Sequence, residues 1–191
     1  VLSLILFMPE KLNSTQLFKR SLNVLRNKTD LHLLMFSSGM SDIPKCLISR
    51  YVKRIKDRTY RTLETNKEVQ SKKMYADGEI TTIRYNISIV VERSDPPFFD
   101  VTFEGEQPPP KWEEAQYVLY AKPKSCLILG TPPSQRWSDH CTLWGYTTCN
   151  SKCLINCQKE FVEKCRIGIP IYLTDCAKTE VEKGPSKRDP K

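Results

Sequence analysis

The stretch EITTIRYNISIVV, residues Glu79–Val91, alternates between two kinds of side chain. One set is largely apolar and consists of Thr81, Ile83, Tyr85, Ile87, Ile89 and Val91. The intervening set is mostly polar and consists of Ile80, Thr82, Arg84, Asn86, Ser88 and Val90. Because successive side chains of a strand point to opposite faces, this pattern predicts a strand with one buried face. We expect Arg84, Asn86 and Ser88 to face solvent.

Shorter segments of the same texture lie on both sides of this strand. Asp77-Gly78 is a two-residue hairpin signal that would join it to a strand over residues 70–75. Turns rich in Gly and Pro separate further candidate strands at Leu31–Phe36, Lys45–Val52, Thr59–Leu63, Phe98–Glu104, Gln116–Ala121, Ser125–Leu129 and Cys141–Trp144. Eight or nine short strands with one apolar face each predict a mainly β protein, either a sandwich or an up-and-down barrel.

Two segments have helical spacing instead. Between Asn13 and Asn27 the apolar residues Leu17, Leu22 and Leu25 follow the N-cap candidates Ser14 and Thr15. A second helix is predicted by a spacing of four along one face, with Asn150 or Ser151 as its cap, in Cys149, Cys153, Cys157, Phe161 and Cys165. Several cysteines on one helical face indicate a helix bonded to the sheet. An extended stretch, Gly168–Leu173, follows and leads to Cys176.

Eight cysteines could form disulfides in a secreted protein or bind zinc in a reducing compartment. Three N-glycosylation sequons favour secretion and begin at Asn13, Asn27 and Asn86. The two histidines, His32 and His140, do not have the spacing of a Cys/His finger. We therefore expect a secreted, glycosylated and disulfide-bonded protein without a metal or another cofactor.

The chain length favours one domain, residues 13–176, between two different ends. The apolar run Val1–Phe7 suggests that residues 1–12 are the end of a signal peptide or an N-terminal extension. Residues 177–191 are charged, and we expect a flexible tail. No other stretch approaches the length of a membrane span.

The net charge of +8 is concentrated in the tail and in Arg50–Arg61, which holds six Lys or Arg among twelve residues. Such a cluster could bind heparin-like glycans, acidic lipids or nucleic acid. A solvated strand face and a charged tail explain it more simply, and the tail lacks the aromatic residues of a nucleic-acid platform. We expect a monomer with neither a nucleic-acid nor a membrane partner.

Catalytic motifs are missing from the sequence: it has no Gly-x-Ser-x-Gly, no His-Glu-x-x-His and no phosphate loop. His140 stands beside Cys141, but a disulfide-bonded Cys141 cannot act as a nucleophile. We expect no catalytic residues and no enzymatic activity.

The predicted order of helix, about eight strands, helix and final strand is similar to the lipocalin plan, a barrel that holds one small ligand. Local residues resemble the tick salivary lipocalins, which include the histamine-binding proteins. These residues are Lys45-Cys46, Tyr117–Tyr120, Cys126–Leu129, Cys141–Trp144, and Cys157 with Phe161 and Cys165. The resemblance covers roughly residues 20–176, and the chain lacks the Gly-x-Trp that general lipocalins carry near the first strand.

The biogenic-amine motif of this family is present only as a skeleton: Cys126, Ile128, Leu143, Trp144 and Cys157. Leu127 and Thr142 occupy the positions of its two acidic residues. A cationic amine in a low-dielectric cavity needs a carboxylate partner. The resemblance therefore implies a binder of small molecules, but not one suited to histamine or serotonin.

The inward positions that the alternation and the resemblance imply are apolar or aromatic. They are Ile83, Tyr85, Ile87, Ile89, Phe99, Val101, Phe103, Leu127, Thr142 and Trp144. Such a lining suits a fatty acid, an eicosanoid or another amphipathic lipid, although the same residues could fill a ligand-free barrel.

The resemblance implies sequestration of a small host mediator. An alternative is a protein-binding inhibitor of host complement or haemostasis that uses loops at the barrel mouth, namely Ser94–Pro97, Gly105–Trp112 and Gly130–His140. Binding of histamine or serotonin without the two motif acids is a second alternative.

The resemblance also implies disulfides. Cys46 is expected to pair with Cys176 and Cys126 with Cys157. Cys141 with Cys165 is expected next, which leaves Cys149 and Cys153. Side chains four apart in a helix are nearly parallel, so a Cys149–Cys153 bond would require Cys149 to precede the helix.

Overall fold

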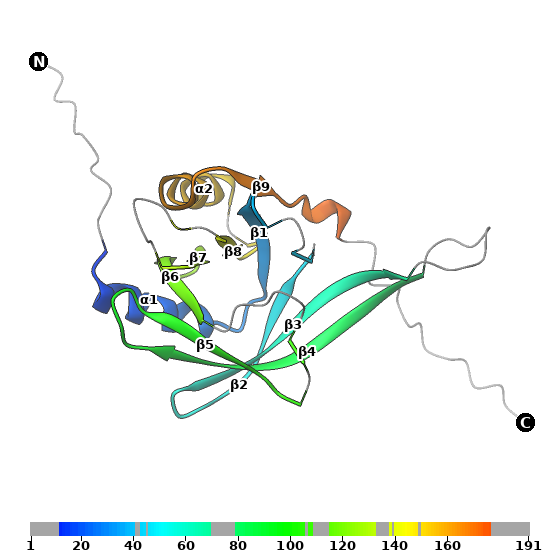
Figure 1. Ribbon diagram of the computed structural model, residues 1–191, viewed down its shortest axis with the longest axis horizontal. Coiled ribbons are helices and arrows are strands. Elements are labelled where there is room, and N and C mark those ends of the chain that lie inside the picture. The colour runs from blue at the N-terminus through cyan, green and yellow to red at the C-terminus, as the bar shows by residue number, and fades with distance from the viewer. Residues whose placement is uncertain are drawn as a thin grey trace, which may run out of the picture.

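The computed structural model describes residues 12–40, 43–44, 46–69, 79–105, 107–108, 115–132, 138, 140–148 and 150–176. Its elements in chain order are α1 (Ser14–Leu25), β1 (Leu31–Ser37), β2 (Ile48–Ile55), β3 (Arg58–Val69), β4 (Glu79–Glu92), β5 (Phe98–Phe103), β6 (Ala115–Lys122), β7 (Cys126–Gly130), β8 (Thr142–Gly145), α2 (Ser151–Cys165), β9 (Gly168–Pro170) and the 3-10 turn η1 (Leu173–Asp175). Figure 1 shows their arrangement.

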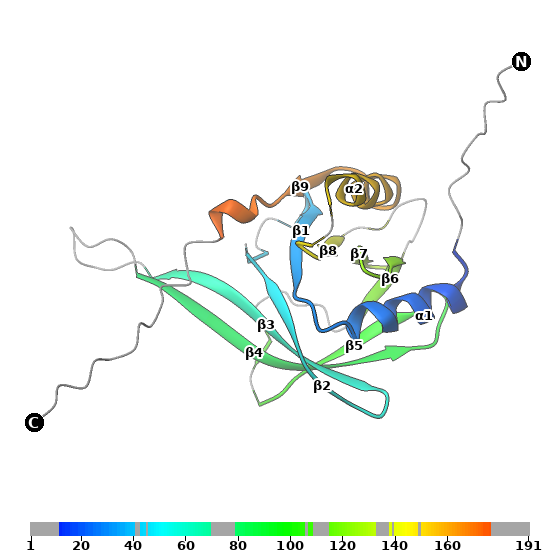
Figure 2. The same ribbon diagram turned by 180° about the vertical axis from the view of Figure 1, so that it is seen from behind.

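The strands β1–β8 form a closed antiparallel barrel. Each of β2–β7 pairs with the next strand along the chain, and β1 closes the barrel by pairing with β8 and β2. The short strand β9 pairs with the second half of β1, beyond the part that contacts β2. Of the two architectures that the strand pattern allowed, the barrel is therefore correct (Figures 1 and 2).

Helix α1 lies against one end of this barrel. It begins after Asn13, whose side chain accepts a hydrogen bond from the Gln16 backbone while the Gln16 side chain accepts one from the Asn13 backbone. The cap is thus Asn13, one residue before the expected Ser14. Leu17, Val24 and Leu25 form the buried stripe of the helix. We call this end, where β1, β3, β5 and β7 begin, the α1 end, and the opposite end the loop end.

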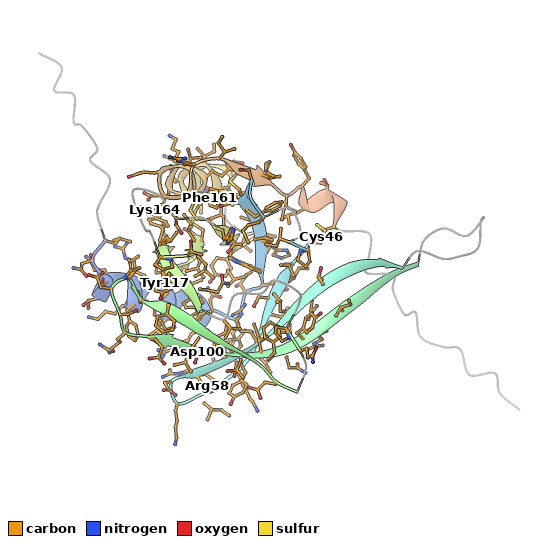
Figure 3. All side chains as sticks on the ribbon, in the orientation of Figure 1. Cys46, Arg58, Asp100, Tyr117, Phe161 and Lys164 are labelled. Carbon is orange, nitrogen blue, oxygen red and sulfur yellow. A yellow bond between two sulfur atoms is a disulfide. The ribbon has the colours of Figure 1, made fainter. Side chains whose placement is uncertain are left out.

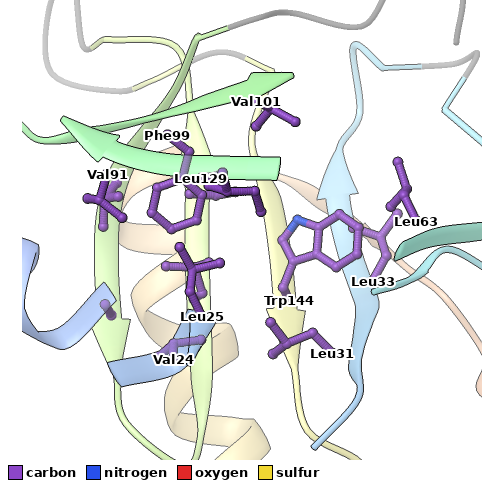
Figure 4. Close-up of a cluster of buried hydrophobic side chains, with 14 of the residues drawn as sticks. Val24, Leu25, Leu31, Leu33, Leu63, Val91, Phe99, Val101, Leu129 and Trp144 are labelled. Atoms are coloured by element: carbon purple, nitrogen blue, oxygen red, sulfur yellow. The ribbon is translucent and has the colours of Figure 1, made fainter. Parts of the chain in front are cut away.

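The barrel interior is apolar. Its main cluster joins side chains from α1 and from strands on all sides, as Figure 4 shows for Val24, Leu25, Leu31, Leu33, Leu63, Val91, Phe99, Val101, Leu129 and Trp144. This burial is the main source of stability, at about 25 cal/mol per Å² of apolar surface removed from water.

Helix α2 packs on the outside of β7 and β8. Cys157, Phe161 and Cys165 form its buried face, and Phe161 points from the helix toward the barrel wall (Figure 3). The disulfides Cys126–Cys157 and Cys141–Cys165 bond the helix to the barrel. A third, Cys46–Cys176, joins the β1–β2 connection to the end of η1. These are the three pairs that the resemblance implies.

Cys153 is disulfide-bonded as well. Its expected partner, Cys149, lies outside the described residues, but α2 begins only at Ser151, so position 149 precedes the helix as that bond requires.

One expectation about this fold is wrong. Ser88 was expected in solvent, but it is fully buried, because Arg58 covers it and donates a hydrogen bond of 2.9 Å to its hydroxyl. The last extended stretch is one residue shorter than expected: the paired strand β9 ends at Pro170, the backbone is still extended at Tyr172, and η1 begins at Leu173. The Asp77-Gly78 turn, most of the N-terminal segment 1–12 and the tail 177–191 lie outside the described residues.

Within the described ranges, no helix is long and apolar enough to cross a membrane.

Candidate ligand site in the barrel interior

The structure brings the ten expected lining residues together on the inward face of the barrel. Strand register aligns Ile87 with Phe103 and Ile89 with Val101 across β4 and β5. It likewise aligns Leu127 with Trp144 across β7 and β8, and Thr142 lies opposite Leu129. Opposed residues of an antiparallel pair share one face of the sheet. Because the apolar members of these pairs belong to the interior cluster, that face is the inward one.

Exposure of this wall increases toward the loop end. Along β4, Val91, Ile89 and Ile87 are buried, whereas Tyr85 and Ile83 are only half-buried. Along β5 the same change occurs from Val101 to Phe103. The interior wall is therefore packed at the α1 end and open to solvent nearer the loop end.

Two polar groups stand out on the inward wall. The Tyr85 ring packs edge-on against Phe103 with centroids 5.6 Å apart, and its hydroxyl has no hydrogen-bond partner among the described residues. Trp144 Nε1 donates to Thr142 Oγ1 over 3.0 Å, which satisfies the buried indole. A ligand in the interior would thus meet mostly carbon and one free phenol.

No carboxylate faces inward from the described parts of the eight strands. Asp100 and Glu104 are exposed, and Asp100 lies opposite Val90 on the outer side of the sheet (Figure 3). Glu64 also points outward, where it pairs with Arg50 at 3.1 Å and Arg84 at 3.7 Å.

The inward face carries a cation that the sequence analysis missed. Arg61 is 1% exposed and lies opposite Ile87. It donates to carbonyl oxygens of Leu25, Asn27, Thr29 and Ser49 and to the Ser49 hydroxyl. Burial lowers its pKa to about 10, so the guanidinium stays charged at neutral pH.

The sequence led us to expect that Arg61, as part of the basic cluster Arg50–Arg61, would face solvent. The alternation could have placed it inward, because it lies two residues from Leu63 on the same strand face.

Tyr146 supports the same end of the barrel. Its hydroxyl donates to the Val24 carbonyl over 2.9 Å, and burial raises the pKa of the phenol to about 12. Together, the hydrogen bonds of Tyr146 and Arg61 hold the C-terminal end of α1 against the α1 end of the barrel.

The three loops expected to form a barrel mouth do not share one end. Ser94–Pro97 connects β4 to β5 at the α1 end, where Ser14 donates to Asp95 and Val118 donates to the Pro97 carbonyl. Strands β5 and β7 end at the loop end, where the described residues 105, 107–108 and 130–132 follow them, and the rest of loops 105–112 and 130–140 lies largely outside the described residues. Ser94–Pro97 therefore does not belong to the mouth.

An eight-stranded antiparallel barrel with a helix at one end and a disulfide-linked helix outside has the lipocalin fold. Among solved structures, the chain is similar to Japanin from Rhipicephalus appendiculatus bound to cholesterol, with a TM-score of 0.59 and 16% identity over 78% of this chain and 94% of that one.

It is also similar to apocrustacyanin C2, with a TM-score of 0.50 and 11% identity over 83% of this chain and 84% of that one. Lobster apocrustacyanin A1 matches with a TM-score of 0.48 and 12% identity over 85% and 88%. No protein-family model and no curated protein matches the sequence. At 16% and 11% identity, the likeness to Japanin and to apocrustacyanin C2 shows the fold alone.

Proposed function

We propose that this chain is a secreted lipocalin of the tick salivary kind that sequesters a small apolar or amphipathic molecule, such as a fatty acid or an eicosanoid. The observation that carries the proposal is the inward wall of carbon and aromatic side chains that is half-buried at Ile83, Tyr85 and Phe103. Burial of a ligand against such a wall contributes about 25 cal/mol per Å². The cholesterol bound to Japanin supports an apolar ligand for this fold.

The disposition of charge argues against a cationic amine. The described inward face offers no carboxylate, and its buried charged side chain is the cation Arg61. An amine buried there would lack a counter-ion and would face a like charge. We therefore rank a neutral or anionic lipid above histamine or serotonin.

Secretion belongs to the same proposal. Three disulfides and a disulfide-bonded Cys153 suit an oxidising compartment. Two of the three sequon asparagines, Asn13 and Asn86, are exposed, and Asn27 is partly exposed. A glycan at Asn86 would extend from the outer side of β4, away from the proposed ligand.

Extraction of the secreted protein with an organic solvent, followed by mass spectrometry, tests this proposal. We expect a lipid that copurifies in stoichiometric amount and that competes with a fluorescent fatty acid. An empty extract together with the absence of displacement by any fatty acid, eicosanoid or sterol would contradict it.

The alternative, inhibition of a host complement or haemostasis protein, would use the loop end. Loops 105–112 and 130–140 lie at that end, and both contain prolines, which lower the entropy cost of ordering a loop at an interface. Inhibition of complement or clotting by lipid-stripped protein, unchanged by added lipid, would favour this alternative.

A further inference from the structure

A group of basic side chains lies at the α1 end of the barrel, apart from the proposed lipid site. Arg54 and Thr59 are opposite each other in the β2–β3 pair, so both side chains lie on one face of the hairpin. Thr59 is also opposite Ile89, which places that face inward. Tyr51 is opposite Arg61 and therefore lies on the same face. Arg26, at the end of α1, lies close enough to Arg54 and Tyr51 to interact with them electrostatically.

Arg61 holds this region in place without being available to a ligand. Its five N–H donors are already used by four backbone carbonyls and one hydroxyl. Two of those carbonyls belong to Leu25 and Asn27, the residues on either side of Arg26. The backbone that carries Arg26 is therefore fixed on both sides.

Two buried polar atoms in this region have no hydrogen-bond partner among the described residues: Arg26 Nε and Thr59 Oγ1. Thr59 is 1% exposed. Both atoms can donate, and buried donors without a partner are rare because desolvation without a compensating bond is costly. Burial lowers the pKa of the Arg26 guanidinium, and Arg54 lowers it further.

We propose that Arg26, Arg54 and Thr59 form a binding site for an oxyanion, a phosphate or sulfate group, at the α1 end of the barrel. Guanidinium groups bind such oxygens through paired N–H donors, and a threonine hydroxyl adds a third direction. Arg54 is exposed and its Nε donates to the Lys56 carbonyl over 2.7 Å, so its terminal N–H groups would meet the anion from the solvent side. Neither arginine forms an ion pair with a carboxylate in the described part of the chain.

An oxyanion fits better than a cation or an apolar group. The unpaired atoms and the neighbouring guanidinium are all donors, and two like charges at close range repel until an anion lies between them. The oxyanion site is also separate from the proposed lipid site, because it lies at the α1 end of the barrel and not at the half-buried wall near Tyr85.

Titration of the purified protein with sodium sulfate and sodium phosphate, against sodium chloride of equal ionic strength, tests the site. Nitrogen-edited NMR would follow the Arg26 Nε–H and the Thr59 amide. We expect saturable shifts with sulfate or phosphate and none with chloride. A sulfated heparin disaccharide and glycerol phosphate, titrated in parallel, distinguish a glycan sulfate from a phosphate ester as the source of the group.

Three variants make the test specific. Because a charge-assisted contact to the anion is lost, Arg54→Gln should weaken sulfate binding by about tenfold to a hundredfold. Thr59→Val removes the unpaired hydroxyl with little change of shape, so it should raise the melting temperature without sulfate and reduce the further rise that sulfate produces. Arg58→Gln is the matched control, because Arg58 belongs to the same hairpin but points to the outer side, toward Ser88.

Equal losses in Arg54→Gln and Arg58→Gln would mean a general charge effect and would overturn the site. So would an unchanged sulfate response in Thr59→Val, or shifts in the native protein that chloride reproduces. If Thr59→Val instead lowers the melting temperature, an ordered water already satisfies the hydroxyl, and the proposal is wrong.

Discussion

Arg61 is the residue on which the α1 end depends most. Replacement by Met keeps much of the apolar stem but removes all five donors, which leaves carbonyls of Leu25, Asn27 and Ser49 without this partner. Since each buried acceptor without a partner costs about 1–3 kcal/mol, we expect Arg61→Met to lower the free energy of unfolding by about 3 kcal/mol or more.

Urea denaturation measures this loss. The control is Arg84→Met, whose side chain is 60% exposed on the outer face, and its effect should stay within about 0.5 kcal/mol. Equal stability of the two variants would refute the role assigned to Arg61.

His32 should make stability depend on pH. Burial lowers the pKa of His32 below the usual histidine value of 6.5, Asp30 opposes that shift, and Arg50 adds to it. The folded protein therefore takes up this proton less readily than the unfolded chain. The contribution of His32 is complete above pH 6.5 and declines as the pH falls below that value, until the folded histidine is protonated too.

Unfolding free energies measured between pH 7.5 and about pH 5.5 should fall for the native protein and fall less for His32→Gln. A larger decline in His32→Gln would show that the sign is wrong.

Side-chain orientation was predictable where the alternation was regular. Ile87 and Ile89 lie on the buried face, and Arg84 and Asn86 lie on the exposed face, as the pattern indicates. The same alternation would have placed Arg61 inward beside Leu63, but the carbonyls at the end of α1 that satisfy its donors are distant in sequence. Ser88 departed from the pattern because Arg58 covers it, and such a long-range contact leaves no periodic signal in the sequence.

At the level of elements, the disulfide that closes the longest loop should stabilise the fold most. Cys46–Cys176 spans 130 residues, whereas Cys141–Cys165 spans 24. In the chain-entropy model these loops correspond to about 5 and about 3.5 kcal/mol. The double variant Cys46→Ser with Cys176→Ser should therefore unfold at lower urea than Cys141→Ser with Cys165→Ser, and the reverse order would contradict the account.

The kind and order of the helices and strands could be predicted from local sequence patterns, but the closure of the sheet into a barrel could not. Every expected strand that lies in the described residues exists, with ends displaced by up to six positions, as at β3, which ends at Val69 instead of Leu63. Sandwich and barrel share those local patterns, and the pairing of β1 with β8 distinguishes them. That pairing joins residues more than a hundred positions apart, which only a family resemblance could supply.

At the scale of the whole molecule, the charge distribution of the barrel interior disfavours binding of a cationic amine. Since Leu127 and Thr142 replace both motif acids and Arg61 adds a buried cation, we expect calorimetry to detect only weak histamine binding. The double substitution Leu127→Asp with Thr142→Glu should strengthen it, because a carboxylate would pair with the amine. The outward orientation of Asp100 removes one candidate for a substitute carboxylate, so tight binding by the native protein would contradict our assignment of inward residues.

The proposed lipid-like ligand would occupy the barrel interior and contact its wall near the loop end. Displacement of a fluorescent fatty acid from Tyr85→Ala and Arg84→Ala tests this proposal most directly, because these adjacent residues of β4 face opposite sides of the wall. Loss of the Tyr85 ring removes about 2 kcal/mol of apolar contact, so affinity should fall about tenfold or more, whereas Arg84→Ala should leave it nearly unchanged. Equal affinities in both variants, or a loss confined to Arg84→Ala, would contradict the interior site.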